Sequence, residues 1–148
     1  MCPICAAPET PIATPDGERP IASLHVGDLV LSLEGGAVVA VPVALAGSTP
    51  VSRHGVTRVT LETGRTLEVS PGHPLADGTH FADLAPGTRL GVEGPLVRAV
   101  ELVPYRHDRT YDILPASSTG TYRVAGAWVR STLRGSSSTG APGARVSR

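Results

Sequence analysis

The sequence predicts an all-β fold of short strands, and three observations support this prediction. The 148 residues include 17 glycines and 14 prolines, so turns are expected at short intervals. Several valine-rich stretches alternate with period two, whereas the spacing typical of amphipathic helices is hard to find. Only five residues are aromatic, so a chain this turn-rich is expected to form β-structure around an aliphatic core.

The expected elements follow one another between turn residues. A strand and a hairpin follow Cys5, and short helical turns are expected at 21–24 and 81–84. The clearest hairpin joins two alternating runs across Thr63-Gly64. The expected strands after the first hairpin cover 28–33, 37–46, 55–62, 65–70, 96–104, 110–114 and 121–129.

The length fits one domain, because a chain near 150 residues buries roughly 70% of its unfolded surface. We expect residues 1–4 to be an N-terminal flank and 5–134 to form the folded domain. Residues 135–148 are rich in serine and glycine, which predicts a disordered tail.

Charge and hydropathy exclude several classes of protein. The 13 basic and 13 acidic side chains balance, which argues against binding to nucleic acid or to an anionic membrane. No stretch approaches the roughly 20 apolar residues of a membrane helix, and the chain does not begin with a signal sequence. The sequence therefore predicts a soluble, monomeric, cytoplasmic protein, or one exported only within a longer precursor.

Three residue types are missing from the chain: asparagine, glutamine and lysine. Their absence excludes a Schiff-base lysine and a phosphate-loop lysine. It also excludes an asparagine that cyclises to break its own peptide bond. No cofactor is expected.

Four residues bear the side chains that nucleophilic acyl chemistry uses. Cys5 offers a thiol near the start of the domain, and Asp112 offers a carboxylate within an expected strand. Ser70 and His73 flank Pro71-Gly72, a turn that can point the hydroxyl and the imidazole at one spot. Each has a simpler interpretation: a buried thiol, a turn serine, a histidine with one hydrogen bond, or an aspartate that binds backbone amides.

These residues lie in four ordered blocks that resemble the Hint superfamily, the domain shared by inteins, Hedgehog autoprocessing domains and bacterial intein-like domains. The first block runs from Cys5 through ETPIATPDGERPIASL to VGDLVLS, and the second is TLEVSPGHPL, with Ser70 where the family usually has threonine. The third block is HFADLAPGTRL, and the fourth combines RTYDIL and TYRVAGAWVRSTL, which resemble the two final strands. The resemblance covers roughly residues 5–133.

The resemblance implies a pseudo-twofold, horseshoe-like all-β fold and an N–S acyl shift at the Ile4–Cys5 bond. Cys5 would attack the Ile4 carbonyl, and His73 would protonate the departing nitrogen. Ser70 would orient the amide or stabilise the oxyanion, and Asp112 would accept or shuttle a proton. The acyl group would pass from the N-terminal flank, or from a fused upstream domain, to water, a thiol or an amine.

The final block departs from the splicing members of the family. Arg130 and Ser131 occupy the positions of the usual His-Asn, and Thr132 follows them. Splicing is therefore excluded, and N-terminal cleavage is the family reaction that remains. Only four residues precede Cys5, so either the natural precursor is longer or the domain persists after losing its substrate. A catalytically silent, standalone domain that acts as a structural or interaction module is the alternative.

A metal site is a further alternative. Cys2 and Cys5 have the C-x-x-C spacing of half a zinc site, which His54 with His107, or His73, would complete. A second such motif is absent, and zinc would mask the Cys5 thiolate. Without a matching block position, His25, His54, His80 and His107 are expected to be solvated, and Arg130 is expected to be a charge at a strand end.

Overall fold

The computed structural model describes residues 6–91 and 94–133 of the chain. Almost all of its regular structure there is β, as the sequence predicted, and the two 3-10 turns fall where helical turns were expected. The flank at 1–4 and the tail at 135–148 lie outside the described residues. The elements are β1 Pro11–Thr14, β2 Gly17–Pro20, η1 Ile21–Ser23, β3 Leu29–Glu34, β4 Ala37–Pro50, β5 Gly55–Leu61, β6 Thr66–Val69, η2 Phe81–Asp83, β7 Val97–Pro104, β8 Arg109–Pro115, β9 Thr121–Val124 and β10 Ala127–Arg130.

Antiparallel pairing joins these strands in three groups, in the orders β10-β9-β1-β2, β3-β4-β8 and β6-β5-β7. The β5–β6 hairpin pairs Thr60 with Thr66 across the expected Thr63-Gly64 turn. The hairpin expected after Cys5 is β1–β2, in which Thr14 pairs with Gly17. The sequence prediction of both hairpins is confirmed.

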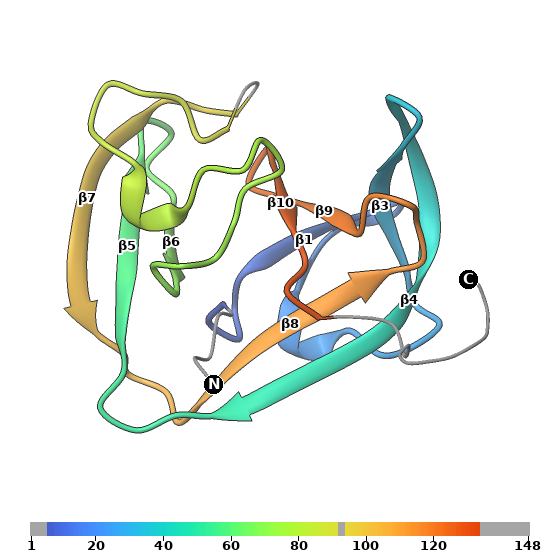
Figure 1. Cartoon of the computed structure of the whole chain (residues 1–148), viewed down its shortest axis with the longest axis horizontal. Helices are drawn as coiled ribbons and strands as arrows, with labels where there is room; N and C mark the ends of the chain where they lie inside the picture. Colours follow the sequence, from blue (N-terminus) through green and yellow to red (C-terminus); the bar gives the residue numbers. More distant parts are fainter. Residues whose placement is uncertain (1–5, 92–93, 134–148) are drawn as a thin grey trace.

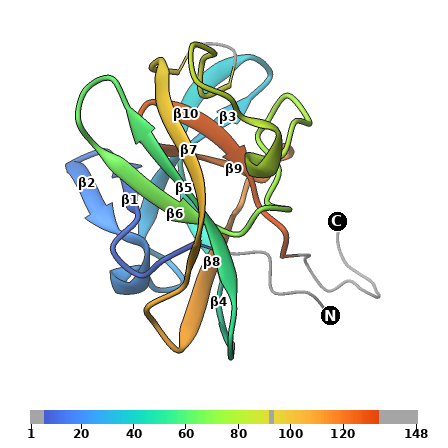
Figure 2. The ribbon, with the colours of Figure 1, turned by 90° about the vertical axis from the view of Figure 1, so that its left-hand side faces the viewer.

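A long two-stranded ribbon connects the two halves of the molecule. The first half of β4 pairs with β3 and the second half pairs with β8, which extends β4 to Pro50 beyond its predicted end at 46. Beyond that pair, the Val51 N–H donates to Asp108 O at 2.9 Å and the Tyr105 N–H donates to His54 O at 2.8 Å. The ribbon then continues as the β5–β7 pair, so the chain bends into an open outline like a horseshoe (Figures 1 and 2).

The prediction of a single strand over 121–129 is wrong. It is a tight hairpin in which β9 and β10 pair from Val124 with Ala127, so Ala125 and Gly126 form a two-residue turn. Both turn residues have positive φ, 50° at Ala125 and 90° at Gly126. These values fit a type I′ turn, in which Asn-Gly is the usual sequence. Ala-Gly is not a typical sequence for such a turn, so the alternating pattern predicted one continuous strand.

One continuous core holds the sheets together and is aliphatic apart from two large rings. Tyr122 on β9 and Phe81 on η2 are both 1% exposed, and both lie against His73. The other large side chains that are fully buried are Ile12, Ile21, Leu61, Leu75, Leu90 and Ile113. The core therefore extends to the place where the polar candidate residues lie.

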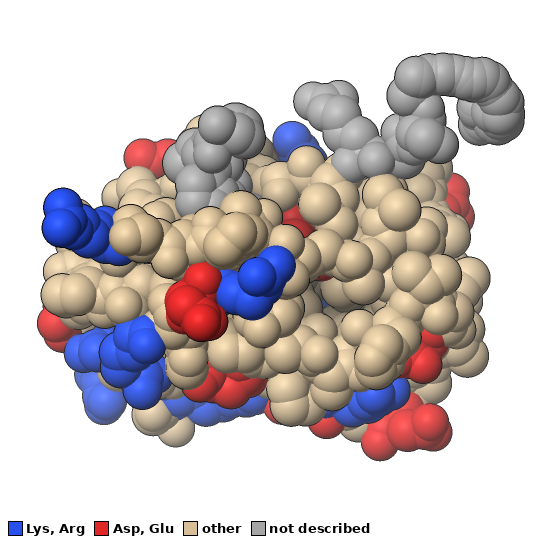
Figure 3. Space-filling view, turned by 90° about the horizontal axis from the view of Figure 1, so that it is seen from below, with Lys and Arg blue, Asp and Glu red and all other residues tan. Residues whose placement is uncertain are grey.

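The surface carries both signs of charge. On the face shown in Figure 3, arginine and acidic side chains lie beside one another on a mainly uncharged surface. Within residues 6–91 and 94–133, no helix has the length and apolar character that a bilayer crossing requires.

Candidate functional site

The chain segment just after Cys5 is inserted between two strands that do not pair with each other. Ala6 forms bridges with both Val69 of β6 and Tyr111 of β8. The Ala6 N–H donates to Tyr111 O at 2.8 Å, and the Tyr111 N–H donates to Ala6 O at 2.9 Å. The next residues along β6 and β8 are Ser70 and Asp112, so Ala6 lies beside two of the predicted site residues.

His73 is held in the core by the turn that the sequence predicted. Its N–H donates to Ser70 O at 3.0 Å, and its carbonyl accepts the Phe81 N–H at 3.1 Å. Ser70 and His73 are each 1% exposed. The imidazole lies edge-on to two rings, with centroids 6.1 Å from Phe81 and 6.4 Å from Tyr122. Two of the predicted residues are thus buried together on one short turn.

Asp112 is 1% exposed and accepts four hydrogen bonds. Its Oδ1 accepts the Tyr122 hydroxyl at 2.5 Å and the Ile113 N–H at 2.9 Å. Its Oδ2 accepts the Thr132 N–H at 2.8 Å and the Thr132 hydroxyl at 2.6 Å. These donors satisfy a buried carboxylate and tie β8 to β9 and to the segment after β10.

Tyr122 connects His73 and Asp112, two predicted residues that do not lie on a shared turn. Its hydroxyl oxygen, bonded to Asp112, also lies 3.4 Å from Nε2 of His73. Sequence reasoning did not single out Tyr122, because its partners are 10 and 49 positions away in the chain. The signal that the sequence offers is that Tyr122 is one of only five aromatic residues.

His54 is a second residue that the sequence analysis did not assign to this site, since it was considered only as a possible zinc ligand. It was expected to be solvated, but it is half-buried, and its Nε2 lies 3.0 Å from Ser70 Oγ in a hydrogen bond. Its ring packs edge-on against Tyr105 at 5.9 Å, and Tyr105 packs against His107 at 5.4 Å. His54 ends the crossing between β4 and β5, and this crossing brings it to Ser70.

Among the remaining histidines, His25 lines the same cavity as Asp112, whereas His80, His107 and Arg130 have other partners. His25 and His80 have exposed side chains, as expected, whereas His107 is half-buried with Nε2 3.3 Å from Glu9 Oε2. Arg130 ends β10 and donates from Nη2 to Ala76 O at 2.9 Å. The structure thus brings Ser70, His73 and Asp112 together, while Cys5 lies outside the described residues.

The metal hypothesis depends on residues that the structure does not describe. Cys2 and Cys5 both lie in the segment before Ala6. In the described part of the chain, no group of three or more His, Cys, Asp or Glu side chains could hold a metal ion. His54 and His107, the pair suggested for zinc, both pack edge-on against the Tyr105 ring.

Two cavities of different size adjoin the candidate residues His73 and Asp112. A cavity of about 10 Å³, no larger than one water, has walls that include Ala6, His73 and Tyr122. A more open cavity of about 160 Å³ reaches Tyr111 and Asp112 from another side. In the described part of the chain, little space is thus left around His73, and a larger opening lies beside Asp112.

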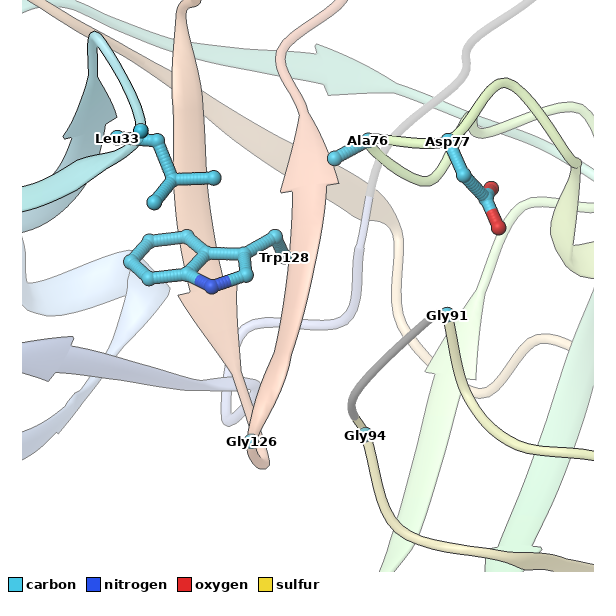
Figure 4. A pocket seen from close by; sticks show the side chains of 8 residues that line it. Leu33, Ala76, Asp77, Gly91, Gly94, Gly126 and Trp128 are labelled. Atoms are coloured by element: carbon cyan, nitrogen blue, oxygen red, sulfur yellow. The ribbon is translucent and has the colours of Figure 1, made fainter.

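A third cavity, of about 340 Å³, lies between Leu33, Trp128 and Asp77 (Figure 4) and shares no lining residue with the candidate group. The hydroxyl and the backbone N–H of Thr79 donate to Asp77 and hold the pKa of that carboxyl below its ordinary value. This carboxylate therefore already has its donors within its own turn.

Comparison with known proteins identifies the family. A sequence model of the Hint domain matches residues 4–117. A bacterial intein-like domain from Clostridium thermocellum has a similar structure, with a TM-score of 0.72 and 19% identity over 88% of this chain and 99% of that one. The gp41-1 intein gives a TM-score of 0.64 and 21% identity, with 85% and 97% of the two chains covered. A DnaB intein from Synechocystis gives 0.68 and 10%, with 87% and 99% covered.

The comparison with curated proteins found no match. The structural likenesses, all at low identity, establish the fold, and the family model spans most of the sequence. The predicted superfamily and the all-β fold are confirmed. The chain belongs to the Hint domain family.

Proposed function

We propose that this domain cleaves the peptide bond between Ile4 and Cys5 by an N–S acyl shift and releases whatever precedes it, without splicing. The observation that supports this most is the insertion of Ala6 between Val69 and Tyr111. Because Cys5 is bonded to Ala6, its Cα lies within about 3.8 Å of the Ala6 Cα. The proposed nucleophile is thus the covalent neighbour of a residue that pairs with Val69 and Tyr111, which directly precede Ser70 and Asp112.

The proposed step balances without a co-reactant. A cysteine thiol is already ionised to roughly a few per cent near neutral pH, so a thiolate can attack the Ile4 carbonyl carbon directly. An S–C bond forms and the carbonyl oxygen takes up the negative charge. The C–N bond then breaks, and the nitrogen takes a proton from His73. The products are a thioester on the Cys5 sulfur, the amine of Cys5 and a neutral imidazole.

His73 is suited to the acid role because an amide nitrogen leaves poorly unless it is protonated. The imidazole is buried, and its ring is fixed between Phe81 and Tyr122. Ser70 is buried one turn away, so its hydroxyl is suited to donate to the oxyanion. A donor held in a dry interior stabilises developing charge more strongly than the same donor in water.

Asp112 was expected to accept or shuttle a proton. Both of its oxygens already accept two hydrogen bonds, so uptake of the thiol proton would require one of these bonds to break. We therefore assign Asp112 a different part, as a fixed negative charge behind Tyr122. The opening that reaches Asp112 is the proposed route for water, a thiol or an amine to the thioester.

The C-terminal end of the domain supports cleavage without splicing. Arg130 and Ser131 stand where splicing members have His-Asn, and the Ser131 N–H donates to Gly120 O at 3.0 Å. Thr132 is bound to Asp112. This end thus lies in the site, but no residue of the chain has a carboxamide that could cyclise.

The deciding experiment fuses a reporter before Met1 and follows the precursor by mass spectrometry with an added thiol. Cleavage is expected to give a reporter that ends at Ile4 as a thioester or acid. Cys5→Ala is expected to abolish it and His73→Ala to slow it by about a hundredfold or more. Cys2→Ala is the matched control and is expected to cleave at the normal rate. A precursor that stays intact through long incubation would leave only the silent module.

A further inference from the structure

Two side chains in the described part of the chain lie within reach of the Tyr122 hydroxyl, which has a single proton. Oδ1 of Asp112 lies 2.5 Å from the phenol oxygen, and Nε2 of His73 lies 3.4 Å from it. Four donors surround Asp112, so both of its oxygens act as acceptors. The proton in the short bond therefore belongs to the phenol, which donates it to the carboxylate.

Because the phenol donates its proton to Asp112, the Tyr122 oxygen can bind the His73 imidazole only as a hydrogen-bond acceptor. A phenol oxygen that faces Nε2 as an acceptor requires a hydrogen on Nε2. The other neutral tautomer would set the lone pair of Nε2 against those of the phenol in a buried place. We infer that Tyr122, held by Asp112, is a positioning residue that fixes His73 as the Nε2–H tautomer.

The surroundings make this control strong. Tyr122, His73 and Asp112 are each 1% exposed, so bulk water cannot take the place of the phenol. Tyr122 is also fixed in the β9–β10 hairpin, where it pairs with Val129. Phe81 holds the imidazole from another direction. The tautomer is thus set by a rigid partner from a distant part of the chain.

The inference rests on the proposed function and makes it more specific. With Nε2 bound to Tyr122, Nδ1 is the ring nitrogen that delivers the proton to the departing nitrogen of Cys5. The imidazolium loses its Nδ1 proton, the amine gains it, and the neutral Nε2–H form remains, bonded to Tyr122.

The first test reads the tautomer directly and does not depend on cleavage. Nitrogen NMR of the full chain labelled at histidine is expected to show hydrogen on Nε2 of neutral His73. Tyr122→Phe, which keeps the ring, is expected to shift His73 toward the Nδ1–H form. Trp128→Phe is the control: it lies in the same hairpin as Tyr122 but lines the separate cavity beside Leu33 and Asp77, and no change is expected. A bare Nε2 in the unaltered protein would overturn the inference without any variant.

The second test measures the rate of cleavage of the reporter fusion. Tyr122→Phe is expected to slow cleavage by about tenfold, the rate equivalent of one hydrogen bond. Trp128→Phe is expected to leave the rate unchanged. If no fusion cleaves but the tautomer behaves as expected, only the proposed function fails. Unchanged tautomer and rate in Tyr122→Phe would overturn the inference while leaving the function intact.

Discussion

At the scale of single residues, the hydrogen bond between His54 and Ser70 sets the direction of a hydroxyl in the candidate site. A serine hydroxyl rotates freely unless a partner fixes it, and Nε2 of His54 lies 3.0 Å away. Because His54 sits at the half-buried edge of the site, it reaches Ser70 from outside the core. We regard His54 as a positioning residue that acts through Ser70.

This relation predicts a specific pattern in a double-mutant cycle. Ser70→Ala and His54→Ala are each expected to slow cleavage of the reporter fusion by about tenfold, since each removes one hydrogen bond. The double variant is expected to be no slower than Ser70→Ala alone, because the two residues act as a unit. The rates come from mass spectrometry of the fusion, with Arg98→Ala, an exposed position on β7, as the control. Fully multiplied losses would show that His54 acts independently of Ser70.

The same residues show how far a sequence can predict such a site. Ser70 and His73 could be predicted together because a Pro-Gly turn between them is local chemistry. Tyr122 and His54 could not, because each reaches the site only when strands far apart in the chain come together. Local motifs thus identify residues that lie on one turn, and they miss residues that reach the site from distant strands.

At the scale of elements, the β9–β10 hairpin is where local sequence and structure disagree. Ala125 has φ 50°, a left-handed conformation that costs a residue with a Cβ about 1 kcal/mol or more. Gly126, at φ 90°, bears no such cost. The pairing of Tyr122 with Val129 and of Val124 with Ala127 holds the turn in place despite the strain. The other strands were predictable because their turns carry glycine, proline or aspartate.

The two turn residues are therefore predicted to respond in opposite directions. Ala125→Gly relieves the left-handed strain and is expected to raise the free energy of unfolding by roughly 0.5 kcal/mol. Gly126→Ala adds strain and also brings a Cβ to 3.4 Å from Pro95 Cδ, so it is expected to lower that free energy by about 1 to 2 kcal/mol. Urea denaturation of both variants measures the difference. Equal effects of the two substitutions would contradict the assignment of the turn.

At the scale of the whole molecule, the fold brings both ends of the described chain to neighbouring residues of β8. Ala6, at the start, pairs with Tyr111, and Thr132, near the end, is bound to Asp112. The ribbon of β4 with β8 and β5 with β7 makes this possible, because it bends the chain so that β6 and β8 flank Ala6 (Figure 1). The geometry thus holds both ends of the described chain beside β8, although no residue of the chain has a carboxamide that could cyclise.

A precursor with a different partner protein at each end tests this division. Only the upstream partner is expected to be released, and the downstream partner is expected to stay attached to the domain, because Ser131 cannot cyclise onto its own carbonyl group. Mass spectrometry distinguishes these products from joined flanks, and a joined product would contradict the prediction. Ser131→Asn combined with Arg130→His supplies the missing side chains at a point where Thr132 is already bound to Asp112. That variant is expected to begin releasing the downstream partner, whereas Ser118→Asn, a matched change in the exposed loop before β9, is expected to release none.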